Sequence, residues 1–238
     1  MGLLGLFGKK SGASALRKHA ERVANKRAQA PDRWESIQAL AQMGGADAIA
    51  ALLPRFTFYV DPSITDQEEK DLAFEAIVGA GEQAVEPVVA FLRRAESISW
   101  PLKMLDALVA PDEVIGRLLG LLEGMDIEYE RDPQRKIQIL AVLEERVDQR
   151  VAPVVIRFLQ DANETVRFHA AGALLAQEPS GEAKQGLMDC LKREESVRVR
   201  VRILDSIIDA GWDLGPSPDL KLPAGYRVDR KGRLQKAS

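Results

Sequence analysis

The chain has little of what most catalytic, metal-binding and secreted proteins depend on. Its 238 residues include one cysteine, Cys190, so an internal disulfide framework is excluded and a reducing, cytoplasmic compartment is expected. The two histidines, His19 and His169, belong to no H-E-x-x-H motif and to no close cluster of metal-ligating residues. The nucleophile motif G-x-S-x-G and the phosphate-binding motif G-x-x-x-x-G-K-S/T are also missing. We therefore expect a protein that is not an enzyme and that binds no cofactor and no metal.

Long hydrophobic runs are missing as well. No segment approaches the roughly 18 to 20 consecutive apolar residues that a membrane-spanning helix needs. The apolar stretch 2–7 is too short for a signal peptide, and Leu6 stands where the myristoylation motif requires Ser or Thr. With 46% hydrophobic and 29% charged residues, the composition is typical of a soluble protein with a folded core.

Charge of one sign is concentrated at the two ends. Residues 1–33 carry eight Lys or Arg against two acidic residues, residues 216–238 carry six against two, and the part between them has a net charge of −13. A basic helix is expected over Ala13–Ala30, either as a cap that seals the first repeat or as a docking arm for an acidic partner. Basic ends can attract nucleic acid or an anionic surface, and this is the alternative function that the sequence leaves open.

What the chain does contain is an internal repeat. Its clearest copy runs from Phe158 to Leu175, and a related copy follows about one unit later. The spacing is 32 residues from Leu159 to Leu191, and 31 residues from Arg167 to Arg198. A near-constant period of this size predicts stacked two-helix repeats.

Five helical pairs and one further helix can be placed on the repeat. Gly, Pro or Asp punctuate the short turns inside the pairs, where such residues end one helix and begin the next. The predicted pairs are 33–43 with 46–56, 67–80 with 83–94, 100–109 with 112–122, 133–146 with 150–160, and 164–177 with 181–192, followed by a first helix over 195–210.

The repeat resembles the HEAT family, in the short form common in bacteria. The resemblance is carried by Leu159-Gln160-Asp161, Val166-Arg167, Ala170-Ala171 and Leu174, and it extends over about residues 33 to 211. It implies an all-α, right-handed α-α superhelix of about five to six helical hairpins, and it is specific for the fold rather than for a function. It also implies a ladder of contacts between successive repeats, with Asp161, Arg167 and Arg198 in the positions that form it.

Two long connections and the second helices supply the candidate contact residues. The connections Thr57–Asp66 and Gly124–Asp132 are longer than usual between helices, and they carry Phe58, Tyr59 and Tyr129. Both follow a second helix, so we expect them on one edge of the repeat array, where the three rings could touch a shared partner. In the family, second helices line the inner face, and the exposed candidates there are Arg93, Arg117, Glu123, Arg157 and Lys192.

A few single positions carry expectations of their own. Cys190 is expected to be a buried, unreactive thiol, and His169 is expected at the edge of the core. The acidic pairs Glu144–Glu145 and Glu194–Glu195 are expected on solvated helix faces.

The sequence thus predicts three parts: a basic N-terminal segment and capping helix over 1–32, a repeat array over 33–213, and a basic tail over 214–238. Alternating apolar and charged residues from Tyr226 to Leu234 are consistent with a short hairpin or with a disordered tail. The function expected is that of a bacterial, cytoplasmic adaptor for another protein, whose identity and oligomeric state the sequence does not give.

Overall fold

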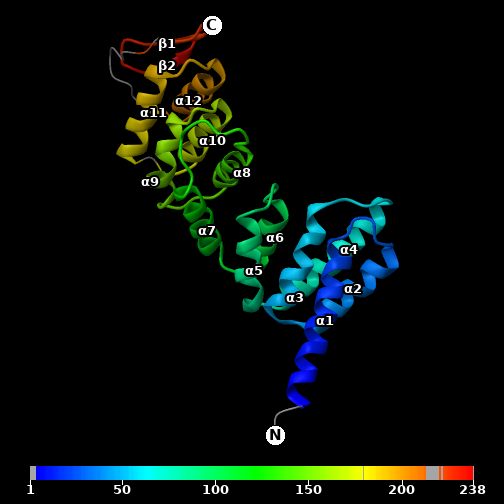
Figure 1. Cartoon of the computed structure of the whole chain (residues 1–238). Helices are drawn as coiled ribbons and strands as arrows, with labels where there is room; N and C mark the ends of the chain where they lie inside the picture. The colour runs from blue at the N-terminus through cyan, green and yellow to red at the C-terminus, as the bar shows by residue number, and fades with distance from the viewer. Residues whose placement is uncertain (1–3, 179, 213–219, 221, 238) are drawn as a thin grey trace. The chain divides into compact units, whose positions relative to one another are not determined.

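The computed structural model describes residues 4–178, 180–212, 220 and 222–237 (Figure 1). Within this part of the chain, helices account for almost all of the regular structure, and the only sheet is a two-stranded hairpin. The protein is therefore all-α, as the sequence predicts. The chain divides into two compact units, Met1–Val114 and Ile115–Ser238, and each is described by itself.

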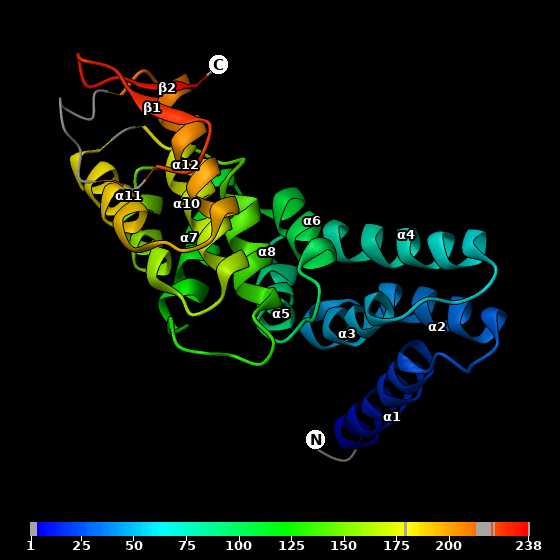
Figure 2. The same ribbon diagram turned by 90° about the horizontal axis from the view of Figure 1, so that it is seen from above.

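Unit 1 is built from two rows of helices. In the first row α2 contacts α4, and α4 contacts α6; in the second row α1 contacts α3, and α3 contacts α5. Figure 2 shows α2 and α4 lying side by side. The elements are α1 (Leu4–Ala24), α2 (Ala30–Met43), α3 (Gly45–Leu52) with its 3-10 continuation η1 (Leu53–Thr57), α4 (Ser63–Gly79), α5 (Glu82–Leu92) and α6 (Ser99–Leu108). The next helix, α7 (Pro111–Glu123), begins at the end of this unit.

Local sequence explains the tight turns of unit 1. Gly44 and Gly45 separate α2 from α3 at φ values of 63° and 78°, and Gly81 separates α4 from α5 at 59°. Glycine adopts this left-handed region without the steric cost that a Cβ atom imposes. The turns bring the apolar faces of paired helices together, so that Ile37, Leu52 and their neighbours form a fully buried core.

Unit 2 repeats the two-row arrangement. Helix α8 contacts α10 and α10 contacts α12 in one row, while η2 contacts α11 in the other. The elements are α8 (Gln134–Leu143), α9 (Val151–Val155) with its 3-10 continuation η2 (Ile156–Gln160), α10 (Glu164–Leu175), α11 (Gly181–Arg193) and α12 (Val197–Asp209). Side-chain caps begin the last three helices: Asn163, Ser180 and Ser196 each accept a hydrogen bond from a backbone N–H of the first turn.

The basic tail contains the predicted hairpin. Strand β1 (Tyr226–Val228) pairs antiparallel with β2 (Leu234–Lys236), and β2 contacts α12. The Tyr226 hydroxyl donates a 2.6 Å hydrogen bond to Asp205 Oδ1, which ties the hairpin to the helix. Of the two alternatives for residues 226–234, the structure therefore has the hairpin.

The sequence placed the helical pairs, but several boundaries were wrong. The N-terminal helix runs from Leu4 to Ala24 rather than from Ala13 to Ala30, because residues 25–29 turn toward α2, which begins at Ala30 rather than Arg33. The second helix of the fourth pair changes from α to 3-10 geometry at Ile156. The connection predicted over Thr57–Asp66 is shorter, because Ser63 to Asp66 already form the first turn of α4. No helix among the described residues is long and apolar enough to cross a membrane.

Candidate partner-binding site

The predicted aromatic contact residues lie in two connections, one in each unit. Tyr59 belongs to the segment between η1 and α4 and leaves 75% of its side chain exposed, while Phe58 beside it is half-buried. Tyr129 lies between α7 and α8 in unit 2 and is 84% exposed. All three were predicted in loops and are found there. Phe58 and Tyr59 belong to unit 1, and Tyr129 belongs to unit 2.

A buried network of charges holds the Tyr59 segment in place. Glu69, fully buried on α4, accepts hydrogen bonds at one oxygen from Arg55 Nε at 2.7 Å and from Arg33 Nε at 2.9 Å. Asp66, one turn earlier, accepts from Arg55 at 2.7 Å and from Lys70 Nζ at 2.6 Å. Three cations therefore share two carboxylates, which leaves a surplus of one positive charge inside unit 1.

Hydrogen bonding dominates the electrostatics of this network. Burial by itself would raise the pKa of Asp66, but the hydrogen bonds from Lys70 and Arg55 outweigh it and hold the pKa below its ordinary value. Asp66 also accepts a 3.0 Å hydrogen bond from the backbone N–H of Val60. On the outside, the Tyr59 ring covers Lys70 Nζ at 3.8 Å from the ring centroid. The network thus fixes both the backbone and the ring of the Tyr59 segment.

The Tyr59 ring also lines the larger hollow described for unit 1, a cleft of about 760 Å³. Its walls come from η1, the Tyr59 segment, the end of α5 and the start of α6. The aromatic and proline side chains that line it are Pro54, Phe56, Tyr59, Phe91, Trp100 and Pro101. This volume is within the range of about 300 to 1,000 Å³ that is typical of ligand pockets.

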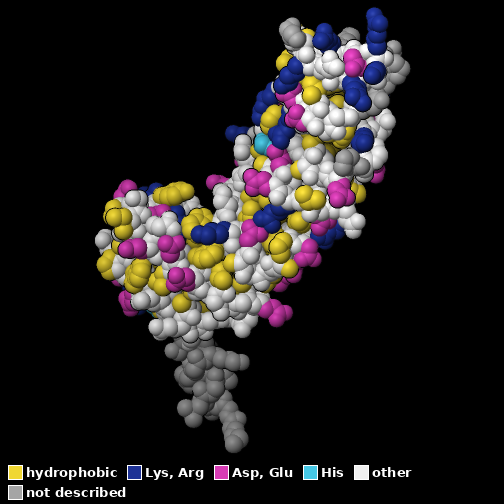
Figure 3. Space-filling model, turned by 180° about the vertical axis from the view of Figure 1, so that it is seen from behind, with side chains coloured by type: hydrophobic (Ala, Val, Ile, Leu, Met, Phe, Trp, Pro, Cys, Tyr) yellow, Lys and Arg dark blue, Asp and Glu magenta, His cyan; other side chains and the backbone are white. Residues whose placement is uncertain are grey.

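Aromatic packing gives the cleft a firm floor. The rings of Phe56 and Trp100 lie 4.8 Å apart and tilted by 50°, and Phe74 packs 6.2 Å from Trp100. Lys103 Nζ lies 4.9 Å from the Trp100 ring centroid and 4.8 Å from that of Phe74. In the lower part of Figure 3, hydrophobic side chains gather around a few basic ones on unit 1. We refer to the hollow floored by Phe56 and Trp100 as the aromatic cleft.

One arginine points to the cleft, but it is not the arginine that the sequence predicted. Arg93 and Arg94 follow α5 and are both exposed, yet only Arg94 lines the aromatic cleft. Within the described residues, the Arg94 side chain makes no hydrogen bond or ion pair. The cleft rim therefore offers one guanidinium to a partner.

The other predicted cations have mainly structural contacts or positions elsewhere. Arg157 donates to the carbonyl oxygen of Leu122 at 2.6 Å and also to those of Glu123 and Met125, so it caps the end of α7. Lys192 is exposed and lies 3.4 Å from Asp189. Arg117 is half-buried on α7, and the Glu123 side chain is exposed at the end of that helix.

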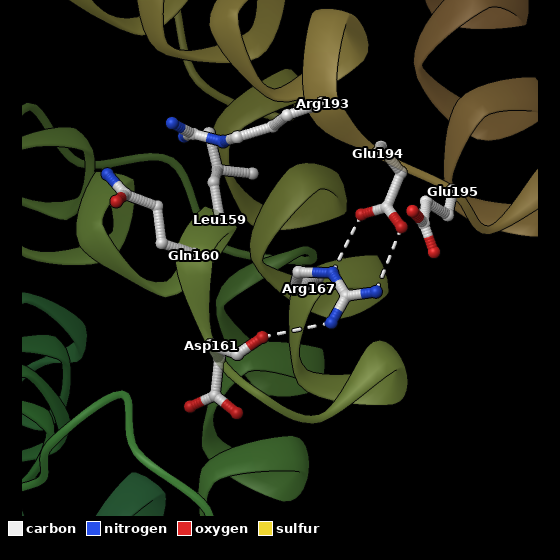
Figure 4. A pocket seen from close by; sticks show the side chains of 7 residues that line it. All are labelled: Leu159, Gln160, Asp161, Arg167, Arg193, Glu194 and Glu195. Atoms are coloured by element: carbon white, nitrogen blue, oxygen red, sulfur yellow. Dashed lines mark hydrogen bonds and ion pairs between the residues drawn. The ribbon is translucent and has the colours of Figure 1, made fainter.

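The residues predicted for a repeat ladder make contacts that differ from the expected ones, and we call the resulting chain of contacts the ladder (Figure 4). The Asp161 carboxylate is 1% exposed and bonds Lys136 Nζ at 2.8 Å, while its backbone carbonyl accepts a 2.9 Å hydrogen bond from Arg167. The Arg167 guanidinium pairs in bidentate fashion with Glu194 at 2.7 and 2.9 Å. Lys136, Asp161, Arg167 and Glu194 thus form a chain of contacts from α8 through α10 to the start of α12.

Arg198 occupies the next step of the ladder in a weaker form. Its guanidinium lies 3.5 Å from Glu164, and both side chains are substantially exposed. It also lies 3.9 Å from the centroid of the Phe168 ring. The hollow above the ladder, of about 390 Å³, is lined largely by charged groups such as Arg167 and Glu194 that already pair with each other.

Two acidic residues expected on solvated faces are instead engaged in ion pairs. Glu194 is 7% exposed, and the hydrogen bonds from Arg167 overcome the effect of burial and lower its pKa. Glu144 is 20% exposed in its side chain and accepts from His169 Nδ1 at 2.6 Å and from Arg202. Burial would raise its pKa, but the bonds from His169 and Arg202 lower it. The prediction was wrong because the partners come from neighbouring helices, which a charge run in the sequence does not reveal.

Cys190 behaves as predicted. Its side chain is 1% exposed, and burial raises the pKa of the thiol to about 11. The described residues include no group of three or more His, Cys, Asp or Glu side chains arranged to hold a metal ion. No known family model and no curated protein matches the sequence.

Proposed function

We propose that this protein is a non-enzymatic scaffold or adaptor that binds another protein through the aromatic cleft of unit 1. The observation that carries the proposal is the combination of stacked aromatic side chains, an exposed tyrosine and an unpaired arginine around one hollow. We further propose a cytoplasmic setting and a HEAT-like fold, in which the helical hairpins form a right-handed superhelix.

The pairing of helices supports the proposed repeat architecture. Within each unit, first helices contact first helices and second helices contact second helices. Such nearest-neighbour contact is how α-solenoids build their core. The ladder from Lys136 to Glu194 supports the same interpretation. Each ion pair joins a first helix to the residue that follows the second helix of its own hairpin, and the bond from Arg167 to the Asp161 carbonyl links one hairpin to the next.

The chemistry of the cleft supports binding rather than catalysis. Large rings and arginine are enriched at the centres of protein interfaces, where a few anchors supply most of the binding energy. The Thr and Ser hydroxyl groups at the cleft have close partners: Thr57 donates to the carbonyl of Pro54 at 2.8 Å, and Ser97 donates to Ser99 at 3.2 Å. What remains for a partner is a largely apolar floor with the Arg94 guanidinium and the Tyr59 hydroxyl at its edge.

The proposal can be tested by affinity capture from the organism that encodes the protein. The variant Tyr59→Ser removes an exposed ring that lines the cleft, and Tyr129→Ser removes an equally exposed ring from the other unit as a matched control. We expect wild type and Tyr129→Ser to capture the same protein and Tyr59→Ser to lose it while its melting temperature stays close to that of wild type.

The three possible outcomes separate the hypotheses. Equal capture by all three proteins would refute the role of the cleft. Loss with both variants would instead favour the sequence-based hypothesis that Phe58, Tyr59 and Tyr129 contact one shared partner. Failure of wild type to retain any protein would contradict the scaffold function itself.

A second candidate function rests on the basic N-terminal segment, which comprises α1 and the turn that follows it. Lys18, Lys26 and Arg27 are exposed, and their side chains form no ion pair within the described part of the chain. The opposite side of α1 packs on α2 and α3, with Val23 fully buried, as a capping helix requires. Nucleic-acid binding through these cations would weaken steeply with rising salt, which a titration with labelled RNA and DNA at two salt concentrations would reveal.

A further inference from the structure

The aromatic cleft has a positive electrostatic environment in a protein whose central part is strongly acidic. Arg94 and Glu96 both line the cleft, so their charges offset each other. The buried network behind Tyr59 contributes a surplus of one positive charge, and Lys103 contributes another from beside the Trp100 ring. The cleft therefore has a local surplus of two positive charges, while the chain between residues 34 and 215 has a net charge of −13.

The surplus charge is placed where a ligand would sense it. Lys70 is 2% exposed and lies against one face of the Tyr59 ring. The same tyrosine lines the cleft. Charges shielded from water act over longer distances than exposed ones, because the medium between them screens less. An anion in the cleft would meet Arg94 directly, and behind the Tyr59 ring it would meet the net charge of the buried network, in which Lys70 is paired with Asp66.

The floor of the cleft sets a second requirement. Phe56 and Trp100 are both partly exposed and pack 4.8 Å apart with a tilt of 50°, which leaves a largely apolar surface whose polar group is the indole N–H of Trp100. Such a surface favours an aromatic or branched aliphatic side chain, whose burial is worth roughly 25 cal/mol for each Å² removed from water.

We propose that the aromatic cleft binds a short acidic peptide segment of a partner protein. An aromatic or aliphatic side chain of the segment lies on Phe56 and Trp100, and a neighbouring Asp or Glu pairs with Arg94. This inference deepens the proposed scaffold function and rests on it, because it names the kind of segment that the scaffold recognises.

A nucleic-acid strand is the competing occupant, since bases also stack on aromatic rings beside cations. The peptide is favoured by Glu96, which lines the cleft, and by the acidic character of the surrounding chain. Glu96 and the surrounding acidic residues would repel a continuous phosphate backbone. One or two carboxylates of a peptide can pair with Arg94 without approaching those acidic groups.

The experiment is a selection of random twelve-residue peptides displayed on phage against the full-length protein. We expect the recovered peptides to combine an aromatic or aliphatic residue with Asp or Glu nearby. Synthetic copies labelled with fluorescein then give dissociation constants by fluorescence anisotropy. Replacing Asp and Glu of a recovered peptide by Asn and Gln should weaken binding about fivefold, the upper range for one exposed charge pair.

Two variants at adjacent positions locate the interaction. Arg94→Glu should weaken the acidic peptide by at least the same factor and should bind a peptide with Lys in place of the acid better than wild type does. Arg93→Glu changes the net charge equally at an exposed position outside the cleft lining and should leave binding within about twofold, since the charge is screened at that distance.

Peptides without acidic enrichment, or equal effects of the two variants, would overturn the inference. A labelled single-stranded oligonucleotide provides a further test. The inference would fail if the oligonucleotide bound wild type, lost binding in Arg94→Glu, and was displaced by neither the acidic peptide nor its Lys-substituted form. None of these results depends on the affinity capture. The scaffold function can therefore stand while the peptide inference fails, and a cleft that binds acidic peptides while wild type captures no protein would be recognised as the opposite case.

Discussion

The side chain of Arg167 is predicted to be a major contributor to the stability of unit 2. Substitution by Ala removes two hydrogen bonds to Glu194, one to the carbonyl of Asp161 and a longer one to the carbonyl of Ala162. Glu194 is 2% exposed in its side chain, so the carboxylate would remain buried with only the backbone N–H groups of Glu195 and Ser196 as partners. Leaving a buried charge unpaired costs about 3 to 5 kcal/mol.

The expected loss is smaller than that upper range. Arg167 is itself 20% exposed, so water can enter where the guanidinium was and recover part of the hydration of Glu194. We expect a loss of about 2 to 3 kcal/mol in the free energy of unfolding, which corresponds to a fall of roughly 5 to 10 °C in melting temperature. Calorimetry of wild type and Arg167→Ala at pH 7 would measure it.

Arg193→Ala is the matched control. Arg193 lies in the same hollow, is exposed, and has no ion pair within the described residues. Its removal should change the free energy of unfolding by no more than about 0.5 kcal/mol. Equal melting temperatures for the two variants would refute the assignment of Arg167 to the ladder.

The same pair predicts a dependence on pH. The folded pKa of Glu194 is lowered, so the pair contributes its full stability above the ordinary carboxyl range and loses it as the pH falls through the folded pKa. The difference in stability between wild type and Arg167→Ala should therefore shrink in acid. A constant difference from pH 7 down to pH 3 would contradict this explanation.

Three further predictions concern single buried positions. Cys190, with a thiol pKa raised to about 11, should not react with a thiol reagent at pH 8 until the protein unfolds, and rapid labelling of native protein would refute its burial. Lys136→Ala should destabilise unit 2 by about 3 kcal/mol in a urea titration, because the buried carboxylate of Asp161 would keep only a backbone N–H as a partner. An unchanged urea midpoint would show that the Lys136–Asp161 pair is exposed to solvent. Gly172→Ala should displace the Arg202 side chain, since an added Cβ would lie 2.0 Å from its guanidinium. Calorimetry should show a loss of about 1 to 3 kcal/mol in the free energy of unfolding, and an unchanged stability would mean that the Arg202 side chain relocates without cost.

Local sequence was sufficient to predict the helices. The repeat period and the Gly and Pro residues between helices act within a few residues of each other, so each turn can be recognised without knowing the fold. Gly44, Gly45 and Gly81 are found at the predicted breaks with positive φ. Boundaries were less predictable where a proline or a 3-10 turn changed the last turn of a helix, as at Ile156.

The partners of the buried charges could not be predicted from the sequence in the same way. Lys136 and Asp161, or Arg167 and Glu194, meet only when the first helix of a hairpin packs beside the end of its second helix, and the two pairs are 25 and 27 residues apart in the sequence. The sequence predicted Asp161 and Arg167 as ladder residues through the family resemblance, but it missed Glu194, which looked like part of an exposed acidic run.

The aromatic cleft shows the same limit. Tyr59 could be selected because it lies in a long connection, where exposed rings are unusual. Phe56 and Trp100 were missed because each lies at the end of a helical element, where an aromatic residue is equally suited to a core. Arg94 was missed because it follows α5 beside a second exposed arginine, Arg93, and the sequence does not distinguish the two. Only the packing of α6 against α5, and of both near η1, brings their side chains to one hollow.

Hydrogen exchange of the full-length protein, with and without the partner recovered by affinity capture, tests the central claim most directly. The proposed function predicts that the partner slows exchange in residues 54–59 and 94–101, the segments that supply most of the aromatic cleft. Protection confined to α1 or to the hairpin of β1 and β2, with the cleft segments unchanged, would show that the partner binds elsewhere and would contradict the account.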